Sequence, residues 1–119
     1  MATKMENLRR NAVYTHGCWD AIIFKKIKNL LGGNVRIMVT GSAPMNADVL
    51  DFLKCAFCCP IREGYGLTET SAGICMTASD DPTSGHVGGV FPCGKMKLRD
   101  IPDMNYLSTD NPPRGEVMF

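Results

Sequence analysis

The residue types best suited to binding a ligand gather in one heptad, Gly64 to Thr70 (Gly-Tyr-Gly-Leu-Thr-Glu-Thr). Its glycines let the backbone approach a ligand closely, and the Tyr65 ring offers a flat face for a purine. The Thr68 hydroxyl and nearby N–H groups can donate to phosphate oxygens, and the Glu69 carboxylate is a hard oxygen ligand for Mg²⁺. The heptad therefore predicts a nucleotide triphosphate site, although a Gly-Tyr-Gly turn is also a common geometric feature.

Two predicted strands position this heptad. Residues 35–39 (Val-Arg-Ile-Met-Val) and 59–63 (Cys-Pro-Ile-Arg-Glu) are typical of short strands, the first with both faces partly covered, and a helical segment lies between them. Strand, helix and strand within about 30 residues predict a βαβ unit with parallel neighbouring strands. Because ligands collect at the carboxyl ends of parallel strands, we expect the loops Gly41 to Pro44 and Gly64 to Gly66 to lie side by side.

Two amphipathic helices are predicted around the first strand. Asp20 is expected to cap a helix over residues 20–31 that ends at a Gly-Gly pair, and Asn46 or Asp48 to cap the second helix. Apolar residues at helical spacing are expected to form the buried stripes: Ile23, Ile27, Leu30 and Leu31 in the first helix, and Val49, Phe52, Leu53 and Ala56 in the second.

The rest of the chain has weaker patterns. We expect residues 1–19 to be a flexible or added segment, residues 20–78 to be the α/β unit with the glycine loops, and residues 79–119 to be a truncated loop and β segment. A broken helix and two strands, the first of them with one wet face, are predicted at residues 71–78, 95–99 and 115–119 respectively.

Composition limits the classes of protein. At 119 residues the chain is at most one domain with a modest core. Its 13 basic and 12 acidic residues give a net charge of +1, which does not favour a nucleic-acid partner. No apolar run approaches the roughly 18 residues of a membrane helix, and the N-terminus lacks the apolar centre of a secretory signal. These features favour an intracellular protein.

Six cysteines are the remaining compositional signal. Cys55 and Cys58 have the Cys-x-x-Cys spacing of a zinc or redox pair, but a zinc site would require a second pair. The histidines, His16 and His86, stand alone, and we expect His86 to be a structural or surface residue. Cys55 lies in an apolar helical run, where a free cysteine behaves as a small hydrophobe. The pattern favours reduced structural thiols and leaves a metal- or thiol-based protein as the weakest alternative.

Four segments in order resemble one family. Residues 35–45 (VRIMVTGSAPM), 64–70 (GYGLTET), 85–93 (GHVGGVFPC) and 113–117 (PRGEV) resemble motifs of the acyl-adenylate-forming enzymes, and specifically of the long-chain acyl-CoA synthetases. The resemblance covers most of this chain but only a small middle part of such an enzyme. It implies an α/β fold, a βαβ piece of the parallel sheet of the large N-terminal domain, followed by a short, mostly β segment.

The resemblance also implies a reaction. ATP and a long-chain fatty acid give acyl-AMP and pyrophosphate, and coenzyme A then attacks to form acyl-CoA, with Mg²⁺ on the phosphates. By resemblance, Tyr65 packs against adenine, Thr68 contacts the α-phosphate, and Glu69 binds Mg²⁺; Thr68 and Glu69 would be the catalytic residues. The remaining implied ATP/AMP-binding residues are Gly41, Ser42, Ala43, Glu63, Gly64, Gly66 and Leu67.

Parts of that machinery lie outside the 119 residues. The resemblance implies a phosphate loop with a lysine, a ribose-binding aspartate and a C-terminal lysine, so we expect this chain to be inactive alone. It places the whole protein in the cytoplasm or at the periphery of an organelle membrane, an association not encoded in this segment. Two alternatives remain open: another adenylate-forming ligase for short-chain, medium-chain or aryl acids or for peptide synthesis, and a non-catalytic nucleotide-binding module.

Overall fold

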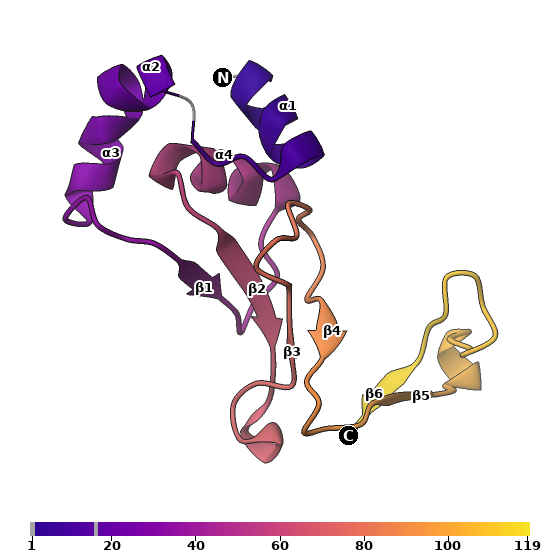
Figure 1. Cartoon of the computed structure of the whole chain (residues 1–119). Helices are drawn as coiled ribbons and strands as arrows, with labels where there is room; N and C mark the ends of the chain where they lie inside the picture. Colours follow the sequence, from indigo (N-terminus) through magenta and orange to yellow (C-terminus); the bar gives the residue numbers. More distant parts are fainter. Residues whose placement is uncertain (1, 16) are drawn as a thin grey trace.

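The computed structural model describes residues 2–15 and 17–119, so His16 lies outside the described residues. The first half contains α1 (Ala2–Asn11), α2 (Gly17–Trp19), η1 (Asp20–Phe24), α3 (Lys25–Leu30), β1 (Met38–Thr40) and α4 (Ala47–Phe57). The second half contains β2 (Ile61–Tyr65), η2 (Thr68–Thr70), β3 (Cys75–Met76), β4 (Gly89–Val90), β5 (Lys97–Arg99), η3 (Pro102–Met104) and β6 (Glu116–Met118). Figure 1 shows the helices α1 to α4 at one end and the β5–β6 hairpin at the side.

The sheet has the order β1-β2-β3-β4. β1 and β2 are parallel, with Met38 opposite Ile61 and Thr40 opposite Glu63, and α4 connects them. The predicted βαβ unit and the α/β fold class are therefore confirmed. β3 and β4 extend the sheet in antiparallel fashion, and β5 pairs only with β6 among the described strands.

The predicted boundaries of both parallel strands were wrong. β1 begins at Met38 rather than at residue 35. Its neighbour β2 is preceded by Pro60, which accepts a hydrogen bond from the Met38 N–H but has no N–H of its own to continue the ladder. β2 runs on through Gly64 and Tyr65, which were expected in a loop. Coverage of β1 also differs from the expectation, since Val39 is 60% exposed.

The second helix has the predicted cap and a different buried face. The Asn46 side chain accepts hydrogen bonds from the backbone N–H groups of Asp48 (2.9 Å) and Val49 (3.3 Å), which confirms Asn46 as the cap of α4. Val49 and Phe52 are exposed, contrary to the predicted stripe, whereas Ala56 is buried as expected. Leu53 is half-buried. The buried face is formed by Leu50, Asp51, Lys54, Cys55 and Ala56.

The N-terminal helix contacts α4. α1 packs on α4 and buries Lys4 and Leu8, while the expectation that residues 1–19 are a flexible or added segment stays a prediction. Lys4 pairs with Asp20 and lies 4.4 Å from the centre of the Phe24 ring. The spacing of apolar residues does not predict buried polar contacts of this kind.

The next helical run begins at Gly17, so the prediction that Asp20 caps it was wrong. The run ends as predicted, because the N–H of Gly33 bonds the carbonyl of Lys28 with both glycines at positive φ. Its predicted buried stripe is largely exposed, with Leu30 at 79%, and Phe24 is buried instead. The described residues contain no helix long and apolar enough to cross a membrane.

The later strands were predicted in part. Residues 71–78 form no broken helix, because β3 pairs with β2 with Cys75 opposite Tyr65. The strands expected near residues 95–99 and 115–119 are β5 and β6, each shorter than predicted. β5 has Leu98 partly covered between exposed neighbours, which matches the expected wet face.

Candidate functional site

A pocket of about 300 Å³ opens at the carboxyl ends of β1 and β2. Two sides of the pocket come from the ends of the parallel strands and the residues that follow them. They are Thr40–Met45, which begins at the last residue of β1, and Glu63–Leu67, which includes the last three residues of β2; both are here called the backbone walls. The third side, here called the anchored wall, is Gly85–Val87. Since Ala43 and Tyr65 line the same pocket, the prediction that the two glycine loops meet is confirmed.

The backbone walls meet because glycines leave room for them. A Cβ atom placed on Gly41 would lie 3.1 Å from the Gly64 carbonyl oxygen, so the Gly64 backbone would have to move by a few tenths of an ångström. A Cβ on Gly66 would lie 1.6 Å from the carbonyl oxygen of Ala72, which no side chain could tolerate. Glycines at these two positions therefore let the backbone of each wall pass close to its neighbours.

Tyr65 is held by both the sheet and an aromatic partner. It lines the pocket from the end of β2, and its ring packs on Phe119, with ring centres 5.9 Å apart and planes 29° apart. Packing of this type stabilises an aromatic pair by roughly 0.5–1.5 kcal/mol beyond the area it buries. The contact restrains the orientation of the Tyr65 ring.

Thr68 and Glu69 do not line the pocket. They lie in η2, which follows Leu67 directly, and both are exposed. Thr70 closes this short turn, because its hydroxyl accepts from the Leu67 N–H (2.8 Å) and donates to the Leu67 carbonyl (2.9 Å). Of the predicted site residues, those from Gly41 to Ala43 and from Glu63 to Leu67 are therefore brought together, and Thr68 and Glu69 stand just outside.

Glu63 has a protein partner. The side chain is buried, and its Oε1 atom accepts a hydrogen bond of 2.8 Å from the Gly85 N–H. The Glu63 N–H donates to the Thr77 hydroxyl at 3.0 Å. The carboxylate thus ties the anchored wall to β2, a contact that nothing in the sequence pattern indicated.

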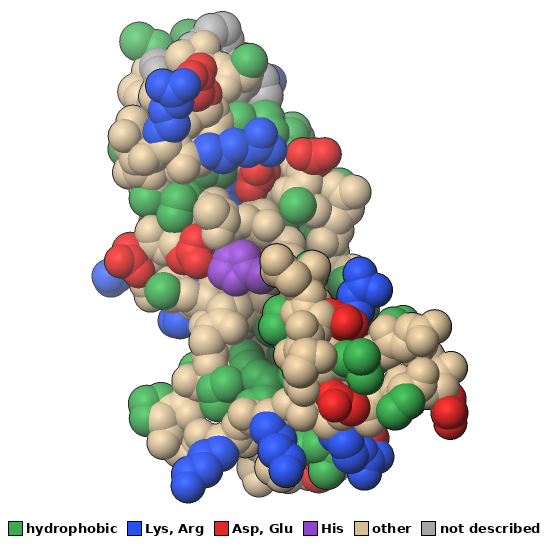
Figure 2. All heavy atoms as spheres, turned by 90° about the vertical axis from the view of Figure 1, so that its right-hand side faces the viewer, with side chains coloured by type: hydrophobic (Ala, Val, Ile, Leu, Met, Phe, Trp, Pro, Cys, Tyr) green, Lys and Arg blue, Asp and Glu red, His purple; other side chains and the backbone are tan. Residues whose placement is uncertain are grey.

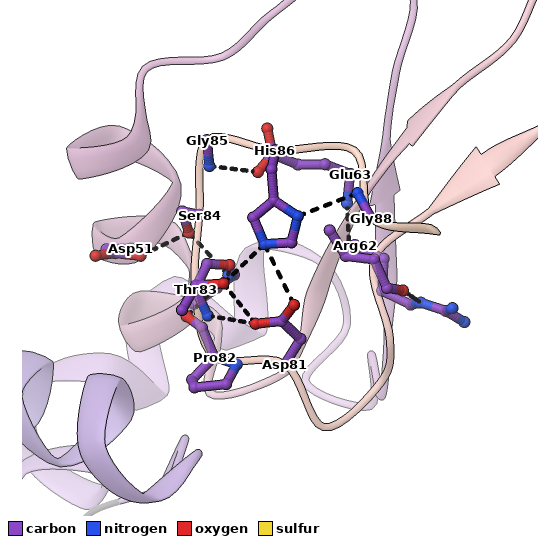
Figure 3. A network of polar contacts seen from close by, with 12 residues as sticks. Asp51, Arg62, Glu63, Asp81, Pro82, Thr83, Ser84, Gly85, His86 and Gly88 are labelled. Atoms are coloured by element: carbon purple, nitrogen blue, oxygen red, sulfur yellow. Dashed lines mark hydrogen bonds and ion pairs between the residues drawn. The ribbon is translucent and has the colours of Figure 1, made fainter. Parts of the chain in front are cut away.

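His86 is a pocket residue that the sequence reasoning did not select. The Gly88 N–H donates to Nδ1 (3.1 Å), while Nε2 contacts the Thr83 hydroxyl (2.7 Å) and Asp81 (3.2 Å), as Figure 3 shows. In the neutral ring this assigns the proton to Nε2. Figure 2 shows the imidazole at the surface beside acidic side chains. The only sequence feature that could have indicated His86 as a pocket residue was its place in a glycine-rich segment.

With Nδ1 bonded to a backbone N–H, the ring cannot accept a proton there without losing that contact, and Asp81 lies on the Nε2 side. The arrangement therefore lacks the geometry of a nucleophile–histidine–carboxylate relay. The hydroxyl and the N–H of Thr83 both donate to Asp81. These two hydrogen bonds hold the pKa of the Asp81 carboxyl below its ordinary value.

The cysteines take no part in the pocket. All six are free thiols, with Cys55, Cys59 and Cys75 buried, and burial raises the pKa of each of these three thiols. Within residues 2–15 and 17–119, no group of three histidine, cysteine or acidic side chains could hold a metal ion. A raised thiol pKa disfavours the reactive thiolate.

Comparison with known proteins identifies the family. Residues 5–119 match the family described as "AMP-binding enzyme". The chain belongs to the AMP-binding enzyme family. It is 46% identical to human "Long-chain-fatty-acid--CoA ligase 1" over 114 residues, covering 96% of this chain and 16% of that protein. It is 52% identical to the Arabidopsis thaliana "Long chain acyl-CoA synthetase 7, peroxisomal" over 100 residues, covering 83% of this chain and 14% of that protein.

A solved structure contains a segment with a similar fold. The A domain of carboxylic acid reductase from Segniliparus rugosus, in complex with AMP and a co-purified carboxylic acid, matches with a TM-score of 0.65 and 27% identity. The match covers 97% of this chain and 17% of that one. The chain thus spans about one sixth of the length of the relatives it matches.

The residues of this chain fit Mg²⁺ only in company with a nucleotide. Mg²⁺ commonly takes one or two carboxylates and fills its other positions with waters and phosphate oxygens. Glu69 supplies one exposed carboxylate beside the pocket, and it has no ion-pair partner among the described residues. This donor set suits a metal carried on phosphates and would not hold the ion alone.

Proposed function

We propose that this chain supplies part of the nucleotide site of an ATP-dependent long-chain fatty acid–CoA ligase. The substrates would be ATP, a long-chain fatty acid and coenzyme A. The observation that carries the proposal is the pocket at the ends of two parallel strands, in a chain 40–52% identical to long-chain ligases and synthetases. Ligands of open α/β sheets bind at this position.

The proposed pose of the nucleotide follows the two backbone walls. Adenine would lie between the Gly41–Ala43 backbone and the Tyr65 ring, because both line the pocket and a flat base can stack on an aromatic ring. The phosphates would then extend past Leu67 toward Thr68 and Glu69. The Thr68 hydroxyl would contact the α-phosphate, and the Glu69 carboxylate would help hold Mg²⁺.

Acyl transfer to AMP requires alignment of the fatty-acid carboxylate with the α-phosphorus and neutralisation of charge on the phosphates. Mg²⁺, when bound, supplies part of that neutralisation. The described pocket has no lysine or arginine in its lining, so we propose that the rest of the enzyme supplies these cations. We therefore expect the 119-residue chain to bind AMP weakly and to show no pyrophosphate exchange.

The binding test compares two tyrosines. AMP titrated into the chain and followed by NMR or calorimetry should saturate, and Tyr65→Ala should weaken binding by about tenfold, as expected for loss of one base–aromatic stack. Tyr106→Ala is the control, since Tyr106 does not line the pocket. No saturable AMP binding by the unaltered chain would refute the proposal.

Two comparisons bear on the class of acid substrate. The reductase domain that shares the fold was solved with AMP and a carboxylic acid. The greater identity to long-chain ligases favours a fatty acid over other acids. Binding of a long-chain acyl-adenylate mimic more tightly than an aryl one would support this choice.

We further propose an intracellular location for the whole protein, in the cytoplasm or at an organelle membrane. Two Arabidopsis relatives are named peroxisomal, which supports an organelle among the candidates. Imaging of a tagged full-length protein, with a membrane wash to release peripheral proteins, would test this location.

A further inference from the structure

Lys54 is a charged side chain that lies outside the pocket lining. It stands on the buried face of α4, and only 2% of its surface is exposed. A buried ammonium is tolerated only where acceptors replace its water shell. Its partners therefore indicate what the side chain is for.

Those partners all belong to one turn. The Lys54 ammonium donates to the carbonyl oxygens of Pro82 (3.3 Å) and Thr83 (2.9 Å) and to the hydroxyl of Ser84 (2.8 Å). An ammonium has three N–H donors, so its full donor capacity goes to this turn. The next residue along the chain is Gly85, the first residue of the anchored wall.

The same turn is held from a second direction by Asp51, one helical turn before Lys54. The Ser84 hydroxyl donates to Oδ1 of Asp51 at 2.7 Å, and Figure 3 shows the contact reaching from the turn to the helix. The other oxygen, Oδ2, accepts from Arg9 Nε at 2.8 Å. Ser84 thus accepts from one residue of α4 and donates to another, which fixes its position.

Beyond Ser84, the Gly85 N–H is held by Glu63 of β2. The turn is therefore attached to α4 directly and to β2 through Gly85, and Gly85–Val87 lines the same pocket as the glycine loops. We propose that Lys54 is a positioning residue: it holds the Pro82–Ser84 turn so that the anchored wall closes the pocket over AMP. The inference rests on the proposed nucleotide site for its ligand.

The experiment removes the ammonium and follows the wall directly. Lys54→Met keeps an unbranched side chain of nearly the same length and removes all three donors. We expect the Gly85 and Gly88 amides to exchange with solvent at least about tenfold faster by NMR, because hydrogen bonds from a charged donor are stronger than those between neutral groups. AMP binding should weaken by a similar factor, while Lys54→Arg, which keeps the charge and donors, should restore most of both.

Lys4 provides a matched control. It is also 2% exposed and also buries an ammonium, paired with Asp20 and bonded to Cys58 at 3.2 Å, but among the described residues it makes no hydrogen bond with the Pro82–Ser84 turn or the anchored wall. Lys4→Met should lower the melting temperature and leave Gly85 exchange and AMP affinity unchanged. Equal effects of the two methionine variants on Gly85 would reduce Lys54 to a general stabilising role and overturn the inference.

Two further outcomes are decisive. Unchanged exchange at Gly85 in Lys54→Met would refute the positioning role. Should Lys54→Met fail to fold, Ser84→Ala removes one of the three acceptors from the turn itself, and it must accelerate Gly85 exchange several-fold for the inference to stand. Absence of AMP binding by the unaltered chain would refute the proposed function instead, while the exchange data would still decide what Lys54 holds in place.

Discussion

The backbone walls and the anchored wall enclose the same pocket by different physical means. The backbone walls are strand ends, placed by the β1–β2 pairing and by glycines that leave room for close approach. The anchored wall lies outside the strands and is held directly by the buried Glu63 side chain of β2, and by Lys54 of α4 through the Pro82–Ser84 turn. The position of the backbone walls depends on steric room, whereas the position of the anchored wall depends on hydrogen-bond partners. Different substitutions should therefore disrupt the two kinds of wall.

The largest effect is expected where the backbone walls have least room. Gly66→Ala would place a Cβ atom 1.6 Å from the Ala72 carbonyl oxygen, so the strand end must move. We expect a loss of about 3 kcal/mol in the free energy of unfolding, the upper range for overpacking, together with loss of AMP binding. Urea denaturation and an AMP titration measure the two effects.

Gly89→Ala is the control for that change, because nothing lies within 4 Å of the added Cβ. It should keep both stability and AMP affinity close to those of the unaltered chain. A tolerated alanine at position 66 would show that the close approach of Ala72 is not required for the fold.

On the anchored wall, Glu63→Ala should come next in size. It leaves the Gly85 N–H without its acceptor, and we expect a loss of about 2 kcal/mol in unfolding free energy, which Glu63→Gln should largely restore because its amide oxygen still accepts. Thermal unfolding by circular dichroism checks the order of the three proteins.

Glu69→Ala contrasts with it, since Glu69 is exposed and its carboxylate makes no ion pair among the described residues. Stability should stay within about 0.5 kcal/mol, as for most surface substitutions. Only the Mg²⁺ dependence of ATP binding should weaken. A stability loss as large as that of Glu63→Ala would contradict the distinction between a structural and a ligand-facing carboxylate.

A smaller effect should follow from the Tyr65–Phe119 stack. Phe119→Ala should cost about 1 kcal/mol and increase the mobility of the Tyr65 ring, seen in its NMR line shapes. Phe52 is equally exposed, at 45%, and no ring stacks on it among the described residues, so Phe52→Ala is the matched control. Identical ring signals in both variants would argue against any support of Tyr65 by Phe119.

The smallest expected effect is a pH dependence of the anchored wall. Hydrogen bonds from Thr83 hold the pKa of Asp81 below its ordinary value of 3.8, so the folded state favours the ionised form. This contribution is present above the unfolded pKa and is lost as the pH falls through the lower folded pKa. The difference in melting temperature between the chain and Asp81→Asn should therefore shrink progressively as the pH falls below about 3.8. A difference that stays undiminished as the pH is lowered further would contradict it.

The backbone walls were predictable because they follow from topology. A βαβ pattern places two glycine loops at one sheet edge without knowledge of any side-chain contact, and Gly41 and Tyr65 do line one pocket. The anchored wall was not predictable, because Lys54 and Ser84 are 30 residues apart and periodicity does not indicate which polar groups meet.

The same limit explains the error in α4. Its apolar spacing favoured Val49 and Phe52 as buried residues, whereas contacts with α1 and the Pro82–Ser84 turn bury Asp51 and Lys54. β3 was missed for another reason, since a strand of two residues is too short to have a period.

The separation of 28 to 30 residues between Lys54 and its acceptors has a consequence for the order of folding. The ammonium can be dehydrated only after α4 has docked and the intervening loop has closed, and closing that loop carries an entropic cost before any of the three bonds compensates for it. The β1–α4–β2 unit should therefore assemble first, and the anchored wall should pack onto it late in the folding reaction.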